Sequence, residues 1–79
     1  WRIAMFDIPE KIKRERWWLS DQLASLGYKR LQKSVFIGQL PIKEDVYKEI
    51  LRRKLKGHIN LLTVGEIDDE QILNDFNLE

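Results

Sequence analysis

The sequence of 79 residues has no cysteine, one histidine and two prolines. Without cysteine the chain forms neither a disulfide nor a thiolate metal site, and this lack fits a reducing compartment. His58 has no cysteine, serine or second histidine at a recognisable catalytic or metal-binding spacing, and no Gly-rich phosphate loop is present. The sequence therefore excludes Ser-His-Asp hydrolysis, P-loop phosphoryl transfer and zinc chemistry.

Long apolar runs are also missing. No segment approaches the roughly 20 residues of a membrane span, and no signal-peptide core is present. We therefore expect a cytoplasmic protein without a membrane partner. Hydrophobic residues make up 43% and charged residues 34%, which predicts a folded chain rather than a disordered one.

The length allows one domain, which we place at residues 1–79. Because the core of so small a domain is thin, we expect it to dock onto a partner or a second copy. The chain opens at Trp1 without an initiator Met, although its first six residues already have the pattern of a strand. We therefore expect it to have been excised from or trimmed off a longer chain.

Charge is divided unevenly along the chain. Residues 1–57 hold all 14 lysines and arginines and 7 acidic residues, whereas residues 58–79 hold 6 acidic residues and no lysine or arginine. Two interpretations are open. The charges are solvated helix faces with an acidic tail, or the first 57 residues present a surface to a polyanion.

The pattern of apolar residues predicts alternating strands and helices. Residues 1–6 are apolar on both faces, which predicts a central strand covered on both sides. A helix is predicted from about residue 10 to 26 with Gly27 as its cap, followed by a strand pair or one long bent strand over residues 29–40.

The second half repeats this plan. A second helix is expected from the stripe of Val46, Tyr47, Ile50, Leu51 and Leu55, ended by Gly57, with the basic residues 52–56 complementing its dipole. A strand over residues 58–67 and a short helix beginning at Asp68 follow, with Gln71 completing a capping box. The order predicts an α+β, ferredoxin-like βαββαβ fold with a short C-terminal helix.

Two adjacent tryptophans lie on the wrong side of the first predicted helix. At 100° per residue, Trp17 and Trp18 fall roughly 145° and 115° from the centre of the apolar stripe. Exposed indoles are enriched at interfaces, so we predict that both contact a partner. The alternatives are a terminal segment or loop folded over them, and the stacking of nucleic-acid bases.

Asp7 stands where the first predicted strand ends. Its carboxylate either caps the following helix by accepting a backbone N–H or binds a hard cation such as Mg²⁺. One carboxylate is a poor cage for a cation, so a metal site here needs further ligands or a symmetry mate. If the protein is a nuclease, Asp7 is its candidate catalytic and metal-binding residue.

A basic cluster marks the start of the first helix and the segment after it. Cations at a helix N-terminus oppose the helix dipole, which suggests a functional reason for their position. Contact with phosphates of a nucleic-acid backbone requires clustered lysines and arginines but no specific motif. The predicted nucleic-acid-binding residues are Lys11, Lys13, Arg14, Arg16, Lys29, Arg30 and Lys33, and the alternative for them is a role in solubility.

Two segments of the sequence resemble a known domain. Residues 6–11 (FDIPEK) before a basic amphipathic helix, and residues 26–40 (LGYKRLQKSVFIGQL), are similar to the Cas2-like domain. This domain occurs as the free-standing CRISPR-associated adaptation protein and as the central domain of PaaX-type repressors of phenylacetate catabolism. The Asp-Ile-Pro-Glu turn, its distance to Gly27 and the closing residues 67–76 more closely resemble the PaaX-type domain.

The resemblance implies a ferredoxin-like homodimer. In PaaX-type regulators the domain dimerises and supports an upstream winged helix-turn-helix that reads the operator, without a cofactor. In the CRISPR family the dimer joins integrase partners and supports spacer DNA, and the aspartate matching Asp7 is assigned Mg²⁺ and nuclease activity. The arginines that follow that aspartate are interrupted here as Arg14-Glu15-Arg16, so we expect the non-catalytic, PaaX-type module, with the adaptation protein as the alternative.

Overall fold

The computed structural model describes residues 1–76, which form strands, α-helices and two short 3₁₀ helices. In chain order they are β1 (Arg2–Phe6), η1 (Glu10–Ile12), α1 (Lys13–Ser25), β2 (Lys29–Gln32), β3 (Val35–Gly38), α2 (Glu44–Arg52), η2 (Lys56–His58), β4 (Ile59–Thr63) and α3 (Glu70–Asp75). This order confirms the predicted α+β, ferredoxin-like arrangement with a short C-terminal helix. Of the predicted domain 1–79, the last three residues lie outside the described part.

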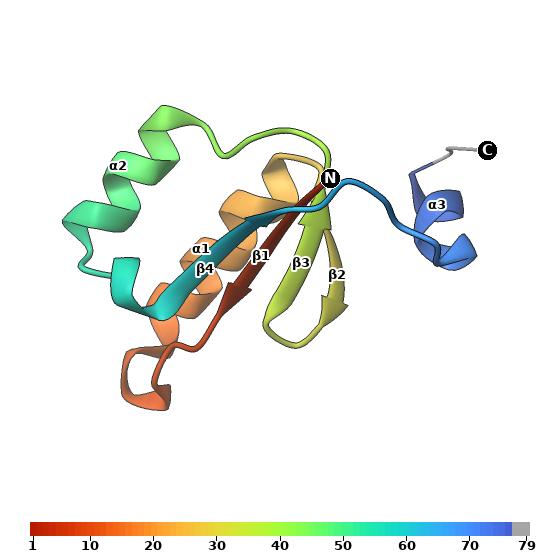
Figure 1. Cartoon of the computed structure of the whole chain (residues 1–79). Helices are drawn as coiled ribbons and strands as arrows, with labels where there is room; N and C mark the ends of the chain where they lie inside the picture. Colours follow the sequence, from red (N-terminus) through yellow and green to blue (C-terminus); the bar gives the residue numbers. More distant parts are fainter. Residues whose placement is uncertain (77–79) are drawn as a thin grey trace.

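The strands form one antiparallel sheet in the order β2-β3-β1-β4 (Figure 1). β1 lies in the interior of the sheet, as its apolar sequence predicted. Ala4 pairs with Phe36 of β3 and Leu61 of β4, and the neighbouring Ile3 pairs with Ile37 and Leu62. Because paired residues share a face and side chains alternate along a strand, this register separates two faces.

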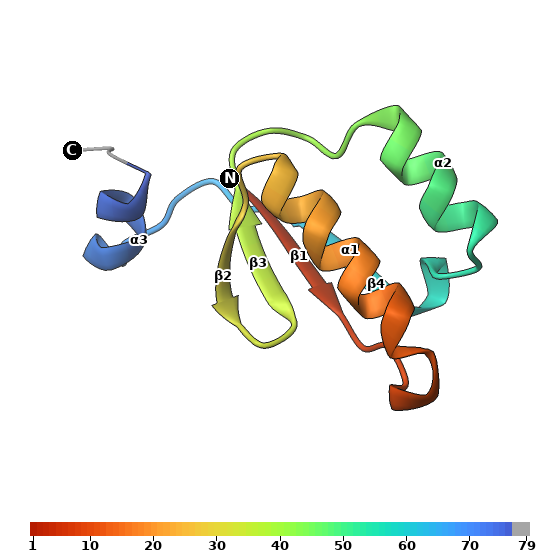
Figure 2. The same cartoon turned by 180° about the vertical axis from the view of Figure 1, so that it is seen from behind.

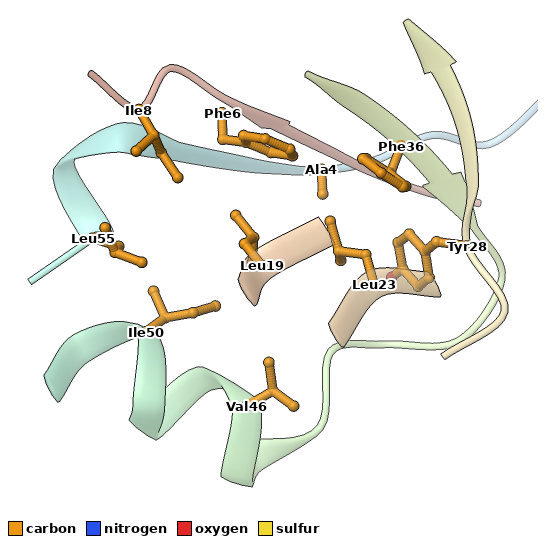
Figure 3. Packing of buried hydrophobic residues seen from close by; sticks show 10 residues of the cluster. All are labelled: Ala4, Phe6, Ile8, Leu19, Leu23, Tyr28, Phe36, Val46, Ile50 and Leu55. Carbon is orange, nitrogen blue, oxygen red and sulfur yellow. The ribbon is translucent and has the colours of Figure 1, made fainter. Parts of the chain in front are cut away.

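Helices α1 and α2 both cover the same face of the sheet (Figures 1 and 2). Each helix connects two parallel strands that flank a third, and such connections are right-handed, so both helices reach the same side. Ala4 and Phe6 of β1 point toward Leu19 and Leu23 of α1 (Figure 3). The buried cluster on this side comprises Ala4, Phe6, Ile8, Leu19, Leu23, Tyr28, Phe36, Val46, Ile50 and Leu55.

Helices α1 and α2 leave the opposite face of the sheet uncovered, and Phe76 at the end of α3 packs edge-on against Trp1 at its margin (Figure 1). The apolar residues of this face, which we call the open face, are Ile3, Met5, Val35, Ile37 and Leu62. Ile37 is fully buried, but Met5 is 37% and Leu62 43% exposed. The prediction that β1 is covered on both sides is therefore wrong for the described residues of a single chain, because both helices occupy the other face.

Gly27 ends α1 as predicted. It has a φ of 87°, a left-handed conformation that favours glycine. The N–H of Gly27 donates to Ala24 O (3.0 Å) and that of Tyr28 to Leu23 O (3.0 Å), which together form a Schellman motif. The first turn of the predicted helix is instead the 3₁₀ helix η1.

Helix α2 ends differently from the prediction. Lys54, rather than Gly57, takes the left-handed position, with a φ of 60°. Its N–H donates to Leu51 O, and the N–H of Leu55 donates to Ile50 O, both at 3.0 Å. Leu55 is 1% exposed, so its burial in the core supports this turn despite the non-glycine residue.

In the C-terminal segment, the last strand is shorter than predicted and the last helix begins later than predicted. β4 ends at Thr63, and α3 is capped by Asp69 instead of Asp68, because the Asp69 carboxylate accepts the N–H groups of Gln71 (2.9 Å) and Ile72 (3.3 Å). The Gln71 side chain donates to Asp75 and does not complete a capping box. α3 stands apart from the α1–α2 layer (Figure 1).

The two edge strands differ in their regularity. β2 carries Lys29 and Arg30, and its register with β3 shifts between Arg30 and Gln32. β4 pairs with β1 in an unbroken register and has no charged residue between Ile59 and Thr63.

Candidate nucleic-acid interface

The predicted nucleic-acid-binding residues fall into separate groups in the structure. One pocket of about 170 Å³ is lined by Arg16 of α1, Arg30 of β2 and Lys33 of the β2–β3 turn, together with Trp17 and Ser20. We call these five residues the basic pocket. Lys11, Lys13 and Arg14 line another hollow at the start of the helix, and Lys29 is paired with Ile37 on the side of the open face.

Two of the basic pocket's cations lack an acidic partner in the part of the chain that the structure describes. Arg16 Nη2 lies 3.0 Å from Glu10 Oε2, with 18% of the Arg16 side chain exposed. Among residues 1–76, neither Arg30 nor Lys33 forms an ion pair. Arg30 instead lies over the Phe36 ring, 5.5 Å from its centroid, which directs its guanidinium along the helix-covered side of the sheet.

The positive charges of this cluster lower the pKa of Glu10. The hydrogen bond and charge of Arg16 hold the pKa of the Glu10 carboxyl below its usual range, and the charges of Lys13 and Lys33 add to this effect. The turn that carries Lys33 and the helix start that carries Glu10 therefore lie close enough to interact. One carboxylate faces several cations, so the local charge is positive.

The two adjacent tryptophans have different environments. Trp17 is 54% exposed and borders the basic pocket, with Lys13 Nζ 5.5 Å from the centre of its ring. Trp18 packs against the core and lies beneath the guanidinium of Arg53. The prediction that both indoles point away from the core is therefore wrong for Trp18, because α2 covers the flank of α1 where Trp18 lies.

Acidic side chains neutralise the basic residues at the end of α2. Arg53 Nη1 bonds to both carboxylate oxygens of Glu15 at 3.1 Å, and its Nε bonds to Glu49 at 2.8 Å. Arg52 also pairs with Glu49, and the two guanidiniums lower the pKa of Glu49 to about 2. The same ion pairs raise the pKa of both arginines. These arginines fasten the two helices and are not available as a polyanion surface.

Asp7 is exposed at the end of β1. Its N–H donates to His58 O at 2.8 Å, so the end of β1 lies beside the start of β4. The predicted helix cap is absent, since neither η1 nor α1 receives a side-chain capping bond. Within residues 1–76 no group of three or more His, Cys, Asp or Glu side chains is placed to hold a metal ion.

Sequence reasoning missed Ser20 and the open face. Ser20 follows Arg16 by one helical turn, so helical spacing alone places it beside the predicted cations. Met5 and Leu62 belong to strands whose partners were unknown, and their common face depends on the sheet register. No helix in the described part of the chain is both long and apolar enough to cross a membrane.

Four antiparallel strands in the order β2-β3-β1-β4, with two helices on one face, define a ferredoxin-like α+β domain. The chain belongs to the family described as the PaaX protein central Cas2-like domain, whose family model matches residues 1–73. This match confirms the resemblance seen in the sequence and extends it from β1 into α3. The chain matches no curated protein and no solved structure.

Proposed function

We propose that this protein is a non-catalytic dimerisation and nucleic-acid-associated module of a PaaX-type transcriptional regulator. Membership in the PaaX central Cas2-like family supports the regulator class. In this proposal a winged helix-turn-helix upstream of Trp1 reads the operator. The present domain pairs two chains and adds salt-dependent contacts to DNA, without a cofactor.

The open face is the observation that carries the dimerisation part. Met5 of β1 and Leu62 of β4 expose 37% and 43% of their surface next to the fully buried Ile37. These two side chains lie diagonally on neighbouring strands of the same face. Each Å² of apolar surface removed from water contributes about 25 cal/mol to association. A second copy offers the same patch, so a two-fold axis through the open face brings apolar residues against apolar residues.

This assignment differs from an interface at both tryptophans. Trp18 is held within its own chain by Arg53 and the core, so only Trp17 is available for a partner. Trp17 is surrounded by cations, and two copies of that surface repel each other. The open face lacks this repulsion at its apolar centre.

Molar mass in solution tests the dimer. We expect light scattering to give twice the chain mass for the wild type, and Leu62→Asp to shift the population toward the monomer. Leu51→Asp is the matched control, because Leu51 has the same 43% exposure but lies on α2. An unchanged mass for Leu62→Asp, or an equal loss in both variants, contradicts the assignment of the interface to the open face.

The nucleic-acid part has a separate test. Arg30 and Lys33 lack acidic partners within the described chain, which leaves them available to phosphates. We expect a labelled DNA duplex to bind at low salt and to dissociate as salt rises, because phosphate contacts release counterions. No binding at 20 mM salt would sink this part of the proposal and leave the dimer untouched.

A further inference from the structure

The basic pocket combines features that a duplex backbone alone does not need. Its cations come from different elements, with Arg16 on α1, Arg30 on β2 and Lys33 in the β2–β3 turn. An exposed indole, Trp17, forms part of the same wall, and the Ser20 hydroxyl lies on the next turn of α1. The result is a small hollow with cationic donors, a hydroxyl and an aromatic surface.

Each of these groups suits one part of a nucleotide. A guanidinium presents a planar fork that fits phosphate oxygens, and a lysine ammonium adds a point charge. An indole offers a flat surface on which any base stacks, whatever its sequence. A base is free to stack in this way only when it is not enclosed in a double helix.

The arrangement of charge favours a ligand that carries its own anion. Glu10 offsets Arg16, but Arg30 and Lys33 remain without a carboxylate partner among residues 1–76. By contrast, Glu15 and Glu49 occupy Arg52 and Arg53 on the far side of α1. Lys13, whose ammonium lies 5.5 Å from the centre of the Trp17 ring, also forms no ion pair among the described residues. Positive charge without a carboxylate partner therefore lies beside the exposed indole.

We propose that the basic pocket binds an unpaired nucleotide of a single strand, with its phosphate held by Arg30 and Lys33 and its base stacked on Trp17. This inference rests on the nucleic-acid association proposed above and names the form of nucleic acid that this site prefers. The volume of about 170 Å³ is large enough for one phosphate group beside the cations and the Trp17 ring.

Fluorescence anisotropy with a labelled ten-nucleotide oligo-dT strand and a duplex of equal length tests the proposal. We expect Trp17→Ala to weaken binding of the single strand about tenfold, the usual effect of losing one stacked base. Binding of the duplex changes less than twofold, because its bases are enclosed. Trp17→Phe restores most of the single-strand affinity, since a phenyl ring also stacks.

The cations are tested by salt dependence. Lys33→Gln and Arg30→Gln are each expected to reduce the slope of log K against log salt by about 0.7 for the single strand, which corresponds to one phosphate contact. Lys48→Gln and Leu40→Ala are the matched controls, because Lys48 is paired with Glu44 on α2 and Leu40 is a 58% exposed apolar residue outside the pocket. Both controls leave affinity and slope unchanged.

The outcomes separate this inference from the proposed function. The pocket proposal is overturned if Trp17→Ala weakens binding of the single strand and of the duplex equally. It is also overturned if both cation variants leave the salt slope of single-strand binding unchanged. In either case, duplex binding by the wild type still supports the nucleic-acid part of the proposed function. Failure of the wild type to bind either probe overturns both the pocket and the nucleic-acid part of the proposed function, and leaves the dimer untouched. Circular dichroism of each variant confirms the fold. Thymidine monophosphate is added as a competitor to the labelled single strand. If it displaces the strand at equal concentration, the pocket binds a free nucleotide; if it does not, the pocket binds a nucleotide within a strand.

Discussion

The guanidinium of Arg53 lies over the indole of Trp18, 4.2 Å from the centre of the ring. The same guanidinium bonds to both carboxylate oxygens of Glu15, one turn earlier on α1. A residue at the C-terminal end of α2 therefore holds α1 through a charged group and an aromatic face. Stacking on Trp18 adds to the ion pair because the ring shields one side of the guanidinium from water.

Two neighbouring substitutions measure this contact. We expect Trp18→Ala to lower the free energy of unfolding by about 2 kcal/mol, because it removes core packing and the partner of Arg53. Trp17→Ala should change it by less than about 0.5 kcal/mol, since that side chain is mostly exposed. Urea unfolding followed by circular dichroism compares the two. Equal losses would contradict the different roles given to the two tryptophans.

Gly38 of β3 is expected to tolerate no side chain. A Cβ at this position would collide with the ring of Tyr28, whose hydroxyl donates to Leu40 O at 2.5 Å. Gly38→Ala should lower the free energy of unfolding by about 1–3 kcal/mol through overpacking. Gly57→Ala is the control, because no atom lies within 4 Å of the added methyl group. A neutral Gly38→Ala would show that the Tyr28 ring moves aside freely.

Lys54 offers a stabilising change. A non-glycine residue in the left-handed region carries a steric cost, so Lys54→Gly should raise the thermal midpoint and add about 1 kcal/mol of stability. Lys56→Gly provides the comparison, because it adds chain flexibility without relieving a left-handed residue. A lower midpoint for Lys54→Gly than for the wild type would refute this explanation of the helix end.

Glu49 predicts a loss of stability in acid. Its pKa is lowered to about 2 by Arg52 and Arg53, from an ordinary value of 4.5. A carboxyl with a lower pKa in the folded state stabilises the fold above pH 4.5, and this contribution is lost as the pH falls toward 2. We expect Glu49→Gln to flatten the decline in stability over this range, with Glu66→Gln as a control for the loss of one charge. An unchanged slope would show that the ion pairs do not favour the folded state.

The non-catalytic proposal makes a prediction for Asp7. Asp7 belongs to no group of three or more His, Cys, Asp or Glu side chains within residues 1–76, and one carboxylate binds Mg²⁺ poorly. We expect the wild type and Asp7→Ala to leave labelled RNA and DNA equally intact in 10 mM Mg²⁺. Cleavage by the wild type that disappears in Asp7→Ala would restore the alternative of a nuclease of the CRISPR adaptation type.

Residues with strong local signals were predicted correctly from the sequence. Apolar residues on both faces predicted β1, and the alternation of apolar and polar residues predicted the β2–β3 pair. Gly27 predicted the end of α1, because glycine adopts the left-handed conformation that ends a helix. Trp18 was misplaced because a helical wheel describes one helix and contains no information about a second helix on its flank. The sequence predicted that Gly57 ends α2, but Lys54 adopts the left-handed conformation that ends this helix. The turn falls at Lys54 because it allows Leu55 to be buried in the core.

The sequence predicted most residues of the candidate site, but it did not predict that they lie together in one pocket. The sequence identified Arg16, Trp17, Arg30 and Lys33 as individual candidates, yet it assigned the tryptophan to a protein partner and the cations to nucleic acid. Only the packing of α1 against β2 brings them into one pocket. The sequence did not predict the open face either, because that face is defined by the side of the sheet on which both helices pack.

The two edge strands of the sheet differ in how readily they pair with a strand of another chain. On β2, the shift in register and the charges of Lys29 and Arg30 obstruct the addition of a foreign strand. On β4, a regular run of Ile-Asn-Leu-Leu-Thr presents uncharged backbone to any extended chain. In concentrated or partly unfolded samples, intermolecular β-structure should therefore grow outward from β4, so a lysine introduced at Leu61 would slow fibril formation more than the same change anywhere on β2.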